Sequence, residues 1–224
     1  MHLLLGVRPT TEHSHAMKHI RLLTLALIIT GLTALRAADS EEGFTILFDG
    51  KTFNGWQLST DNPSTWKIED GAFVARGPVA HLFYTGDPKP FKNFELKVDV
   101  MTEPISNGGI YFHTAYQEKG FPRAGIECQV NVSHGDWIKT GSLYGLVNIG
   151  LTPAKDNQTW TQHIIVRGSK VTVKIDGKTV LEYNEPPGAQ SGGGRKLGEG
   201  IFALQAHDPK SIIRYKNIRV KRLD

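Results

Sequence analysis

The stretch FELKVDVM, residues 94–101, decides the fold class. Apolar side chains occupy every second position from Phe94 to Val100, and the charged side chains of Glu95, Lys97 and Asp99 lie between them. Side chains of a β-strand alternate between two faces, so this pattern predicts a strand with one buried and one solvated face. Such half-buried strands are typical of antiparallel sheets.

Short segments of the same kind fill the chain after residue 40, and almost none of it has helical periodicity. Turn residues separate them, including Asp70-Gly71 and Asp176-Gly177, which predict tight hairpins. This is the pattern of an all-β sandwich or barrel, for example a lectin-like jelly roll with a concave ligand-binding sheet. The predicted strands are 44–48, 66–69, 72–75, 81–84, 94–101, 109–114, 125–132, 143–149 (weak), 162–167, 170–175, 179–183, 200–206 and 213–222. Residues 185–200, rich in Gly and Pro, predict a flexible surface loop.

The first 38 residues are predicted to precede the folded domain, which spans 39–224. Residues 17–38 have a basic start, a run of mostly apolar residues and small residues at the end, which is the layout of a secretory signal peptide. The alternative is an uncleaved anchor, but the run is short for a membrane span. Met17 is then the expected start, with residues 1–16 over-called. We expect a periplasmic or secreted protein with no membrane span after signal cleavage.

Charge and cysteine content bear on the partners. The net charge of +4 falls to +1 without residues 1–38, which hold four of the 26 Lys and Arg residues and one of the 22 acids. The basic pI therefore gives no support for a nucleic-acid partner. Cys128 is the single cysteine, so no intrachain disulfide forms, and we expect it to be buried as a small apolar residue. The sequence does not determine the oligomeric state.

Three predicted strands carry unusual polar faces. In GIECQVN, residues 125–131, Glu127, Gln129 and Asn131 share one face. Alternation likewise places Tyr111 with His113 in GIYFHT (109–114), and Gln205 with His207 in GIFALQAHD (200–208). Each residue alone is readily explained as solvated or as hydrogen-bonded in the core. Together they predict a shared site on one sheet, because acids and amides within a sheet are costly unless partnered.

The missing motifs narrow the chemistry. Ordinary glycoside hydrolysis uses two carboxyl groups, whereas this strand offers Glu127 with Gln129 and Asn131 beyond it. The chain has no HExxH, GxSxG or dinucleotide-binding fingerprint. One carboxylate with a histidine is sufficient for proton abstraction beside a carbonyl group.

An ordered set of motifs runs along the chain: LFDGKTFNGW (47–56), WKIEDGAFV (66–74), FKNFELKVDV (91–100), NGGIYFHT (107–114), GIECQV (125–130), TGSLYG (140–145), TWTQHIIVRGSKVTVKIDGKTV (159–180), IFALQAHD (201–208) and IRYKNIRVKRL (213–223). This set resembles one family of sugar-processing domains, the 3-keto-disaccharide hydrolases, also described as 3-keto-glucoside 1,2-lyases and 3-keto-2-hydroxy-glucal hydratases. The resemblance covers about residues 43–223. It implies a concanavalin-like jelly roll of two antiparallel sheets that acts on a small-molecule oxidised glycoside.

The chemistry implied by this resemblance is proton abstraction at carbon 2, elimination of the group on carbon 1, and hydration, which together amount to hydrolysis. Glu127, His113 and His207 are the expected catalytic residues, with Glu127 and His113 as base and acid in either order. Substrate contacts are expected from Tyr111, Gln129, Asn131 and Gln205. No cofactor is established by the sequence. A divalent metal held by His113, Glu127 and His207 is a hypothesis, because no tight ligand spacing supports it.

The alternative function is a non-catalytic, lectin-like carbohydrate-binding module that uses the same face. Binding tolerates loss of the acid at Glu127, whereas elimination requires a base there. A structural domain without a ligand is a third alternative, but it leaves the polar row unexplained.

Overall fold

The computed structural model describes residues 41–189 and 195–223, and Ser40–Asp224 form one compact unit. The predicted signal peptide and start, residues 1–38, lie outside the described residues. Within the described ranges the chain forms β-strands joined by turns and loops, with one short 3₁₀ turn at Pro63–Thr65. None of the described helical segments has the length and hydropathy needed to cross a membrane.

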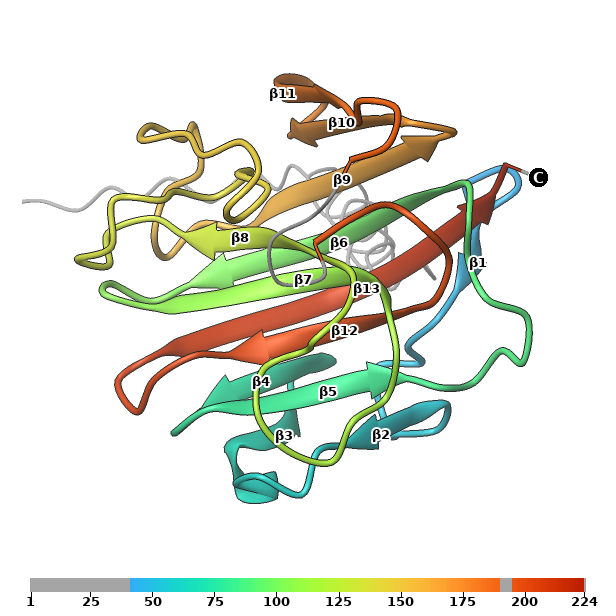
Figure 1. The fold of residues 1–224 in the computed structure, drawn as a ribbon. Helices are drawn as coiled ribbons and strands as arrows, with labels where there is room; N and C mark the ends of the chain where they lie inside the picture. Colours follow the sequence, from blue (N-terminus) through green and yellow to red (C-terminus); the bar gives the residue numbers. More distant parts are fainter. Residues whose placement is uncertain (1–40, 190–194, 224) are drawn as a thin grey trace, which may run out of the picture. The chain divides into compact units, whose positions relative to one another are not determined.

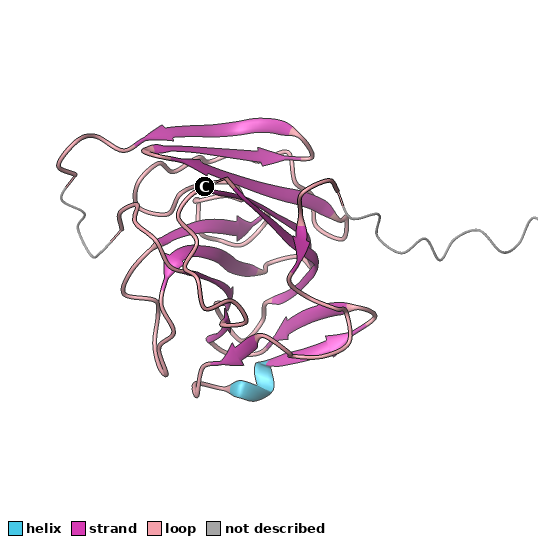
Figure 2. Ribbon diagram, turned by 90° about the vertical axis from the view of Figure 1, so that its right-hand side faces the viewer, coloured by secondary structure: helices cyan, strands magenta, loops and turns pink. Residues whose placement is uncertain are grey.

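The strands form two antiparallel sheets, as predicted, and these are stacked as two layers (Figures 1 and 2). The first sheet has the order β11 (Lys178–Asn184), β10 (Lys170–Ile175), β9 (Trp160–Arg167), β6 (Phe94–Thr102), β13 (Ile212–Arg222), β4 (Ala72–Arg76) and β3 (Trp66–Glu69), with β1 (Thr45–Ile46) also paired to β13. The second has the order β2 (Trp56–Leu58), β5 (Ala80–Tyr84), β12 (Ile201–Ala206), β7 (Asn107–Thr114) and β8 (Ile126–Asn131).

The core lies between the sheets. Strand β6 alternates buried and half-buried residues along its whole length, with Phe94 and Val98 fully buried. Ile126, Cys128 and Val130 of β8 are fully buried in the same core. Each large apolar side chain buried in this way contributes about 1.5–3 kcal/mol, so the alternation fixes which face of each strand turns inward.

Most of the predicted hairpins and strands are confirmed, with two corrections. Both predicted turns have positive φ at the Asp and the Gly, 50° and 72° at Asp70-Gly71 and 49° and 77° at Asp176-Gly177, as a type I′ hairpin requires. Residues 143–149 form isolated bridges rather than a strand, because the backbone of Leu143 pairs with Val147 in its own turn. The short strand β2 was not predicted.

The outer face of the five-stranded sheet is covered over β7 and β8. Every residue of β7 and β8 is buried, including those that point away from the core. The connection between β7 and β8 crosses β12 and β5 in Figure 1, and its backbone bonds to Thr60 near β2. The polar row therefore lies under loops, where unpartnered polar atoms are costly.

Candidate active site

The floor of the site is built by strands β7, β8 and β12 in register. Tyr111 lies opposite Glu127, and Gly109 lies between Gln129 on one side and Gln205 on the other. Gly109 is required here, because a Cβ at this position would lie 2.8 Å from Cγ and 2.9 Å from Cδ of Glu127. The missing side chain leaves the space in which the Glu127 carboxyl group rests.

A chain of hydrogen bonds leads to Glu127. The Gln205 amide donates from Nε2 to the Tyr111 hydroxyl (3.0 Å), which donates to Oε2 of Glu127 (2.8 Å). Burial raises the pKa of Glu127 to about 7, although the Tyr111 bond and the positive charge of Arg195 both lower it. A carboxyl group with this pKa exchanges protons near neutral pH, which is the property of a general base or acid.

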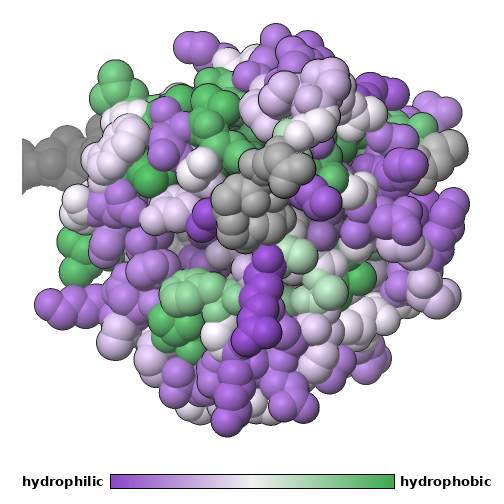
Figure 3. Space-filling view, in the orientation of Figure 1, coloured by the Kyte–Doolittle hydropathy of each residue, from purple (hydrophilic) through white to green (hydrophobic). Residues whose placement is uncertain are grey.

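Above this floor lies a cavity of about 310 Å³. Hydrophilic and hydrophobic side chains are interspersed over the face seen in Figure 3. The cavity is lined by Asn107, Tyr111, Phe121, Pro122, Gly125, Glu127, Gln129, Asp136, Tyr144, Arg195, Gln205 and His207. Its mixture of rings, amides and charges suits a small polar ligand.

Two amide oxygens of the floor lack partners. Oε1 of Gln129 and Oε1 of Gln205 are buried and accept no hydrogen bond from the described residues. The other end of each amide is fixed, because Gln129 Nε2 donates to Asn107 (2.6 Å) and Gln205 Nε2 donates to Tyr111. Acceptors held in this way are complementary to hydroxyl donors of a ligand.

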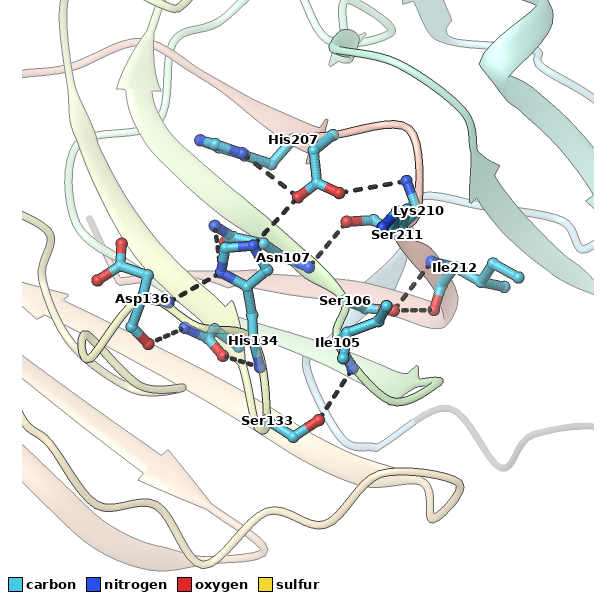
Figure 4. A network of polar contacts seen from close by, with 12 residues as sticks. Ile105, Ser106, Asn107, Ser133, His134, Asp136, His207, Lys210, Ser211 and Ile212 are labelled. Carbon is cyan, nitrogen blue, oxygen red and sulfur yellow. Dashed lines mark hydrogen bonds and ion pairs between the residues drawn. The ribbon is translucent and has the colours of Figure 1, made fainter.

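A network of polar side chains surrounds Asn107 and His207, which line the cavity, and includes His134 beside them (Figure 4). The Asp136 amide donates to Nδ1 of His134 (3.1 Å), so the proton of the neutral ring is on Nε2, 3.5 Å from Oδ2 of Asp208. The same carboxylate oxygen lies 3.6 Å from Nδ1 of His207. Asp208 thus lies between two imidazoles, and Nε2 is the nitrogen of His207 that remains for a substrate.

Loop residues that sequence reasoning missed complete the wall. Asp136 follows β8 in the segment held by Asn131, whose Nδ2 donates to the carbonyl groups of Asp136 (3.0 Å) and Ile138 (2.7 Å). Arg195 comes from the Gly-rich segment predicted to be only a surface loop, and its guanidinium lies 5.5 Å from the centre of the Tyr144 ring. No periodic pattern marks loop residues, so alternation had no means of finding them.

Asn131 itself does not line the cavity. Its side chain is fully buried, and its Oδ1 accepts the His134 amide at 3.0 Å. The structure therefore places Asn131 below the loop that carries Asp136 rather than in the cavity wall.

His113 lies outside the site, although strand alternation predicted that it would share a face with Tyr111. His113 has a φ of 56°, and the pairing of β12 with β7 shifts register between Ile201 and Ala203. This bulge turns the ring away from Tyr111, because an extra residue reverses the faces that follow it. Its Nε2 contacts the Lys92 carbonyl (2.9 Å), and its Nδ1 accepts the Gly198 amide (3.1 Å).

The hypothetical metal site does not fit this arrangement. Both nitrogens of His113 are bonded to backbone, so His113, Glu127 and His207 do not converge on one point. Within residues 41–189 and 195–223, no three His, Cys, Asp or Glu side chains are arranged to hold a metal ion.

Comparisons with solved structures reveal the same fold in carbohydrate-active proteins. A proposed glycosyl hydrolase from Parabacteroides distasonis is similar with a TM-score of 0.67 and 22% identity, over 82% of this chain and 95% of that chain. A carbohydrate-binding module from Bacillus subtilis has a TM-score of 0.56 and 14% identity, over 75% and 96%. An endo-β-1,3(4)-glucanase has a TM-score of 0.55 and 13% identity, over 80% and 91%. At these identities the likeness shows the fold alone, a concanavalin-like jelly roll.

Sequence comparison identifies the family to which the chain belongs. A 3-keto-disaccharide hydrolase of Bacteroides thetaiotaomicron is 35% identical over 89 residues, which cover 36% of this chain and 31% of that protein. The family model of 3-keto-α-glucoside-1,2-lyase-like domains matches residues 43–221, nearly the whole described chain. The chain therefore belongs to the family of 3-keto-α-glucoside-1,2-lyase-like domains, the enzyme family that its motifs indicated.

Proposed function

We propose that the protein is an enzyme that cleaves 3-keto-glycosides, with Glu127 as the base that removes the proton from carbon 2. The observation that carries the proposal is the buried Glu127 carboxyl group, whose pKa is raised to about 7, in a cavity that the guanidinium of Arg195 also lines. The 3-keto group acidifies the neighbouring hydrogen, so a base of this strength is sufficient to remove it.

The electrons released at carbon 2 first form an enolate with its charge on the oxygen of carbon 3. Arg195 supplies the positive charge that stabilises this oxygen, and within the described residues it forms no ion pair with a carboxylate. The ketone then re-forms, a double bond forms between carbons 1 and 2, and the bond from carbon 1 to the aglycone oxygen breaks. Addition of water across the double bond yields the free 3-keto sugar.

The departing aglycone oxygen needs a proton. His207 is the donor in this proposal, because Nε2 remains for the substrate while Nδ1 is buried beside Asp208. Gln129 and Gln205 orient the sugar by accepting its hydroxyl groups, and Tyr111 holds the Glu127 carboxyl group in place. Proton transfers of this kind contribute about 10²–10⁴-fold each to a rate.

The test uses the chain with a 3-keto-glucoside that carries a chromogenic leaving group, beside the unoxidised glucoside, with and without a chelator. The proposal is supported if the chromogenic group is released from the keto substrate but not from the unoxidised glucoside, and if Glu127→Gln abolishes this release. Glu182→Gln is the matched control, because this carboxylate lies exposed on β11 of the other sheet. Saturable sugar binding without release would favour the lectin-like module instead.

Export is part of the same proposal, supported by the signal-peptide pattern of residues 17–38. Fractionation of cells that express the full chain tests it. Enrichment in the periplasm or the medium is the expected result, and retention of the full-length chain in the cytoplasm contradicts it.

A further inference from the structure

A second set of unpartnered polar atoms lies beside the cavity, at His81 of β5. This side chain is fully buried, and neither ring nitrogen has a hydrogen-bond partner among the described residues. Burial lowers the pKa of His81 to about 4, so the ring is neutral and presents one donor and one acceptor. Proteins rarely leave both nitrogens of a buried imidazole without a hydrogen-bond partner. Each such nitrogen has lost its hydrogen bond to water on burial without a replacement, which costs free energy.

His81 is the cross-strand neighbour of Gln205, the floor residue with the unpartnered Oε1. The Tyr111 ring, which bonds both Gln205 and Glu127, stands edge-on to His81 with the ring centres 5.9 Å apart. Three unmade hydrogen bonds, one donor and two acceptors, therefore lie next to the residue that positions the proposed base. Two of them, the N–H of His81 and Oε1 of Gln205, match one hydroxyl group, which both accepts and donates.

Phe121 covers this position. Its ring stands edge-on to His81 at 5.7 Å, lies 5.6 Å from the His207 ring, and forms part of the cavity wall. Yet Phe121 is 48% exposed, and it packs in neither hydrophobic cluster of the described residues. A ring exposed to this extent has space to rotate away from what lies beneath it.

The backbone under Phe121 is held by hydrogen bonds to the side chain of Gln117. Gln117 Nε2 donates to the carbonyl groups of Lys119 (2.7 Å), Gly120 (3.1 Å) and Phe121 (2.8 Å). The amide of Arg123 donates to the other end of the same side chain at 3.0 Å. A hydrogen-bonded loop with an exposed ring is suited to a gate that opens without refolding.

We propose that His81 and Gln205 form a subsite for a hydroxyl group of the glycoside, and that Phe121 closes it when no ligand is bound. This inference rests on the proposed function for the class of ligand. The hydroxyl group accepts from the N–H of His81 while donating to Gln205 Oε1. Occupation of the subsite engages Gln205, which in turn holds Tyr111 against Glu127.

The charged groups around His81 are few. Asp61, which accepts the Gly120 amide of the gating loop, favours the charged imidazole, and His207 opposes it. Neither forms a hydrogen bond with His81. The ring is therefore free to bond a neutral ligand.

The first experiment follows histidine ring nitrogens by NMR in the full chain carrying Glu127→Gln, which binds the 3-keto-glucoside without turning it over. Saturating ligand is expected to shift the N–H nitrogen of His81, to which the hydroxyl group bonds. His163, on β9 and bonded to Glu95, serves as the internal control and does not shift. Saturable binding that leaves the His81 nitrogen shifts unchanged overturns the proposal. The same holds if those shifts show that His81 is already hydrogen-bonded to a trapped water and they do not respond to ligand.

Two variants separate binding from structure. His81→Phe is expected to weaken glycoside binding about tenfold without lowering the melting temperature, because the orphaned nitrogens are removed with the ring shape retained. Unchanged affinity with a lowered melting temperature assigns His81 a structural role and refutes the subsite. In Phe121→Ala, the pKa of His81 is expected to return toward its ordinary value of 6.5 because the ring becomes hydrated; an unchanged pKa refutes the gate.

The outcomes distinguish this inference from the function on which it rests. If the protein turns over the keto substrate but the His81 signals do not respond to ligand, the subsite is refuted and the proposed enzymatic function stands. If ligand shifts the His81 signals but the unmodified chain shows no turnover, the proposed enzymatic function is refuted and the subsite stands.

Discussion

Replacing Glu127 with Gln is expected to stabilise the protein at alkaline pH. Burial raises the pKa of the carboxyl group from its ordinary 4.5 to about 7. Below pH 4.5 the group is protonated in both the folded and the unfolded chain and has no effect. As the pH rises from 4.5 to 7 the unfolded chain ionises first, so the native state loses stability until both states are ionised.

The magnitude follows from the two pKa values. Each pKa unit corresponds to about 1.4 kcal/mol, so the ionised group costs the native state about 3 kcal/mol above pH 7. Gln has the same shape and still accepts the Tyr111 hydroxyl, but it carries no charge. The free energy of unfolding of Glu127→Gln, relative to the unmodified chain, should therefore rise by about 3 kcal/mol between about pH 4 and pH 8.

Urea unfolding at both pH values, followed by Trp fluorescence, measures this difference, with Glu182→Gln as the exposed control. The control should show no gain at pH 8. A Glu127→Gln difference that is equal at the two pH values would refute the reasoning, because Glu127 would then titrate alike in the folded and unfolded chains. Confirmation would mean that a destabilising carboxylate is retained at this place, as expected of a functional group.

Three further outcomes are expected. Tyr111→Phe removes the hydrogen bond that lowers the pKa of Glu127, so the acidic limb of the pH profile of kcat/KM should move to higher pH; an unmoved limb contradicts Glu127 as the base. Gly109→Ala places a methyl group against Glu127 and should lower kcat on the order of 10²-fold by displacing the carboxyl group, while circular dichroism shows a retained fold; full activity would show that the carboxyl position is unimportant. His113→Phe removes two bonds to backbone and should reduce the free energy of unfolding by about 1–3 kcal/mol without moving the pH profile; a lost acidic limb would restore His113 to the chemistry.

The prediction of the fold from sequence succeeded where the deciding information is local. The alternation from Phe94 to Val100 fixes a buried face because only one phase of the strand removes these side chains from water. The two Asp-Gly turns close their hairpins because both central residues adopt positive φ. The same alternation placed Glu127 and Gln129 together on the face opposite the core, where the structure has them.

The prediction that His113 shares a face with Tyr111 was wrong because strict alternation assumes regular strand pairing without a bulge. The bulge that reverses this side chain comes from the pairing of β7 with β12, a strand about 90 residues later in the chain, and a His residue carries no local signal of it. Loop residues have no period at all, so Asp136, Arg195 and Phe121 were not predicted to line the cavity.

The sequence by itself therefore determined the two-sheet architecture, the family and the polar strand face that carries Glu127. Only the tertiary structure decided that this face is covered by loops, that Arg195 and Asp136 join it, and that His113 leaves it. The physical reason is the range of the interactions. Strand alternation and turn geometry act over a few neighbouring residues, whereas the burial that raises the pKa of Glu127 depends on segments brought together by the completed fold.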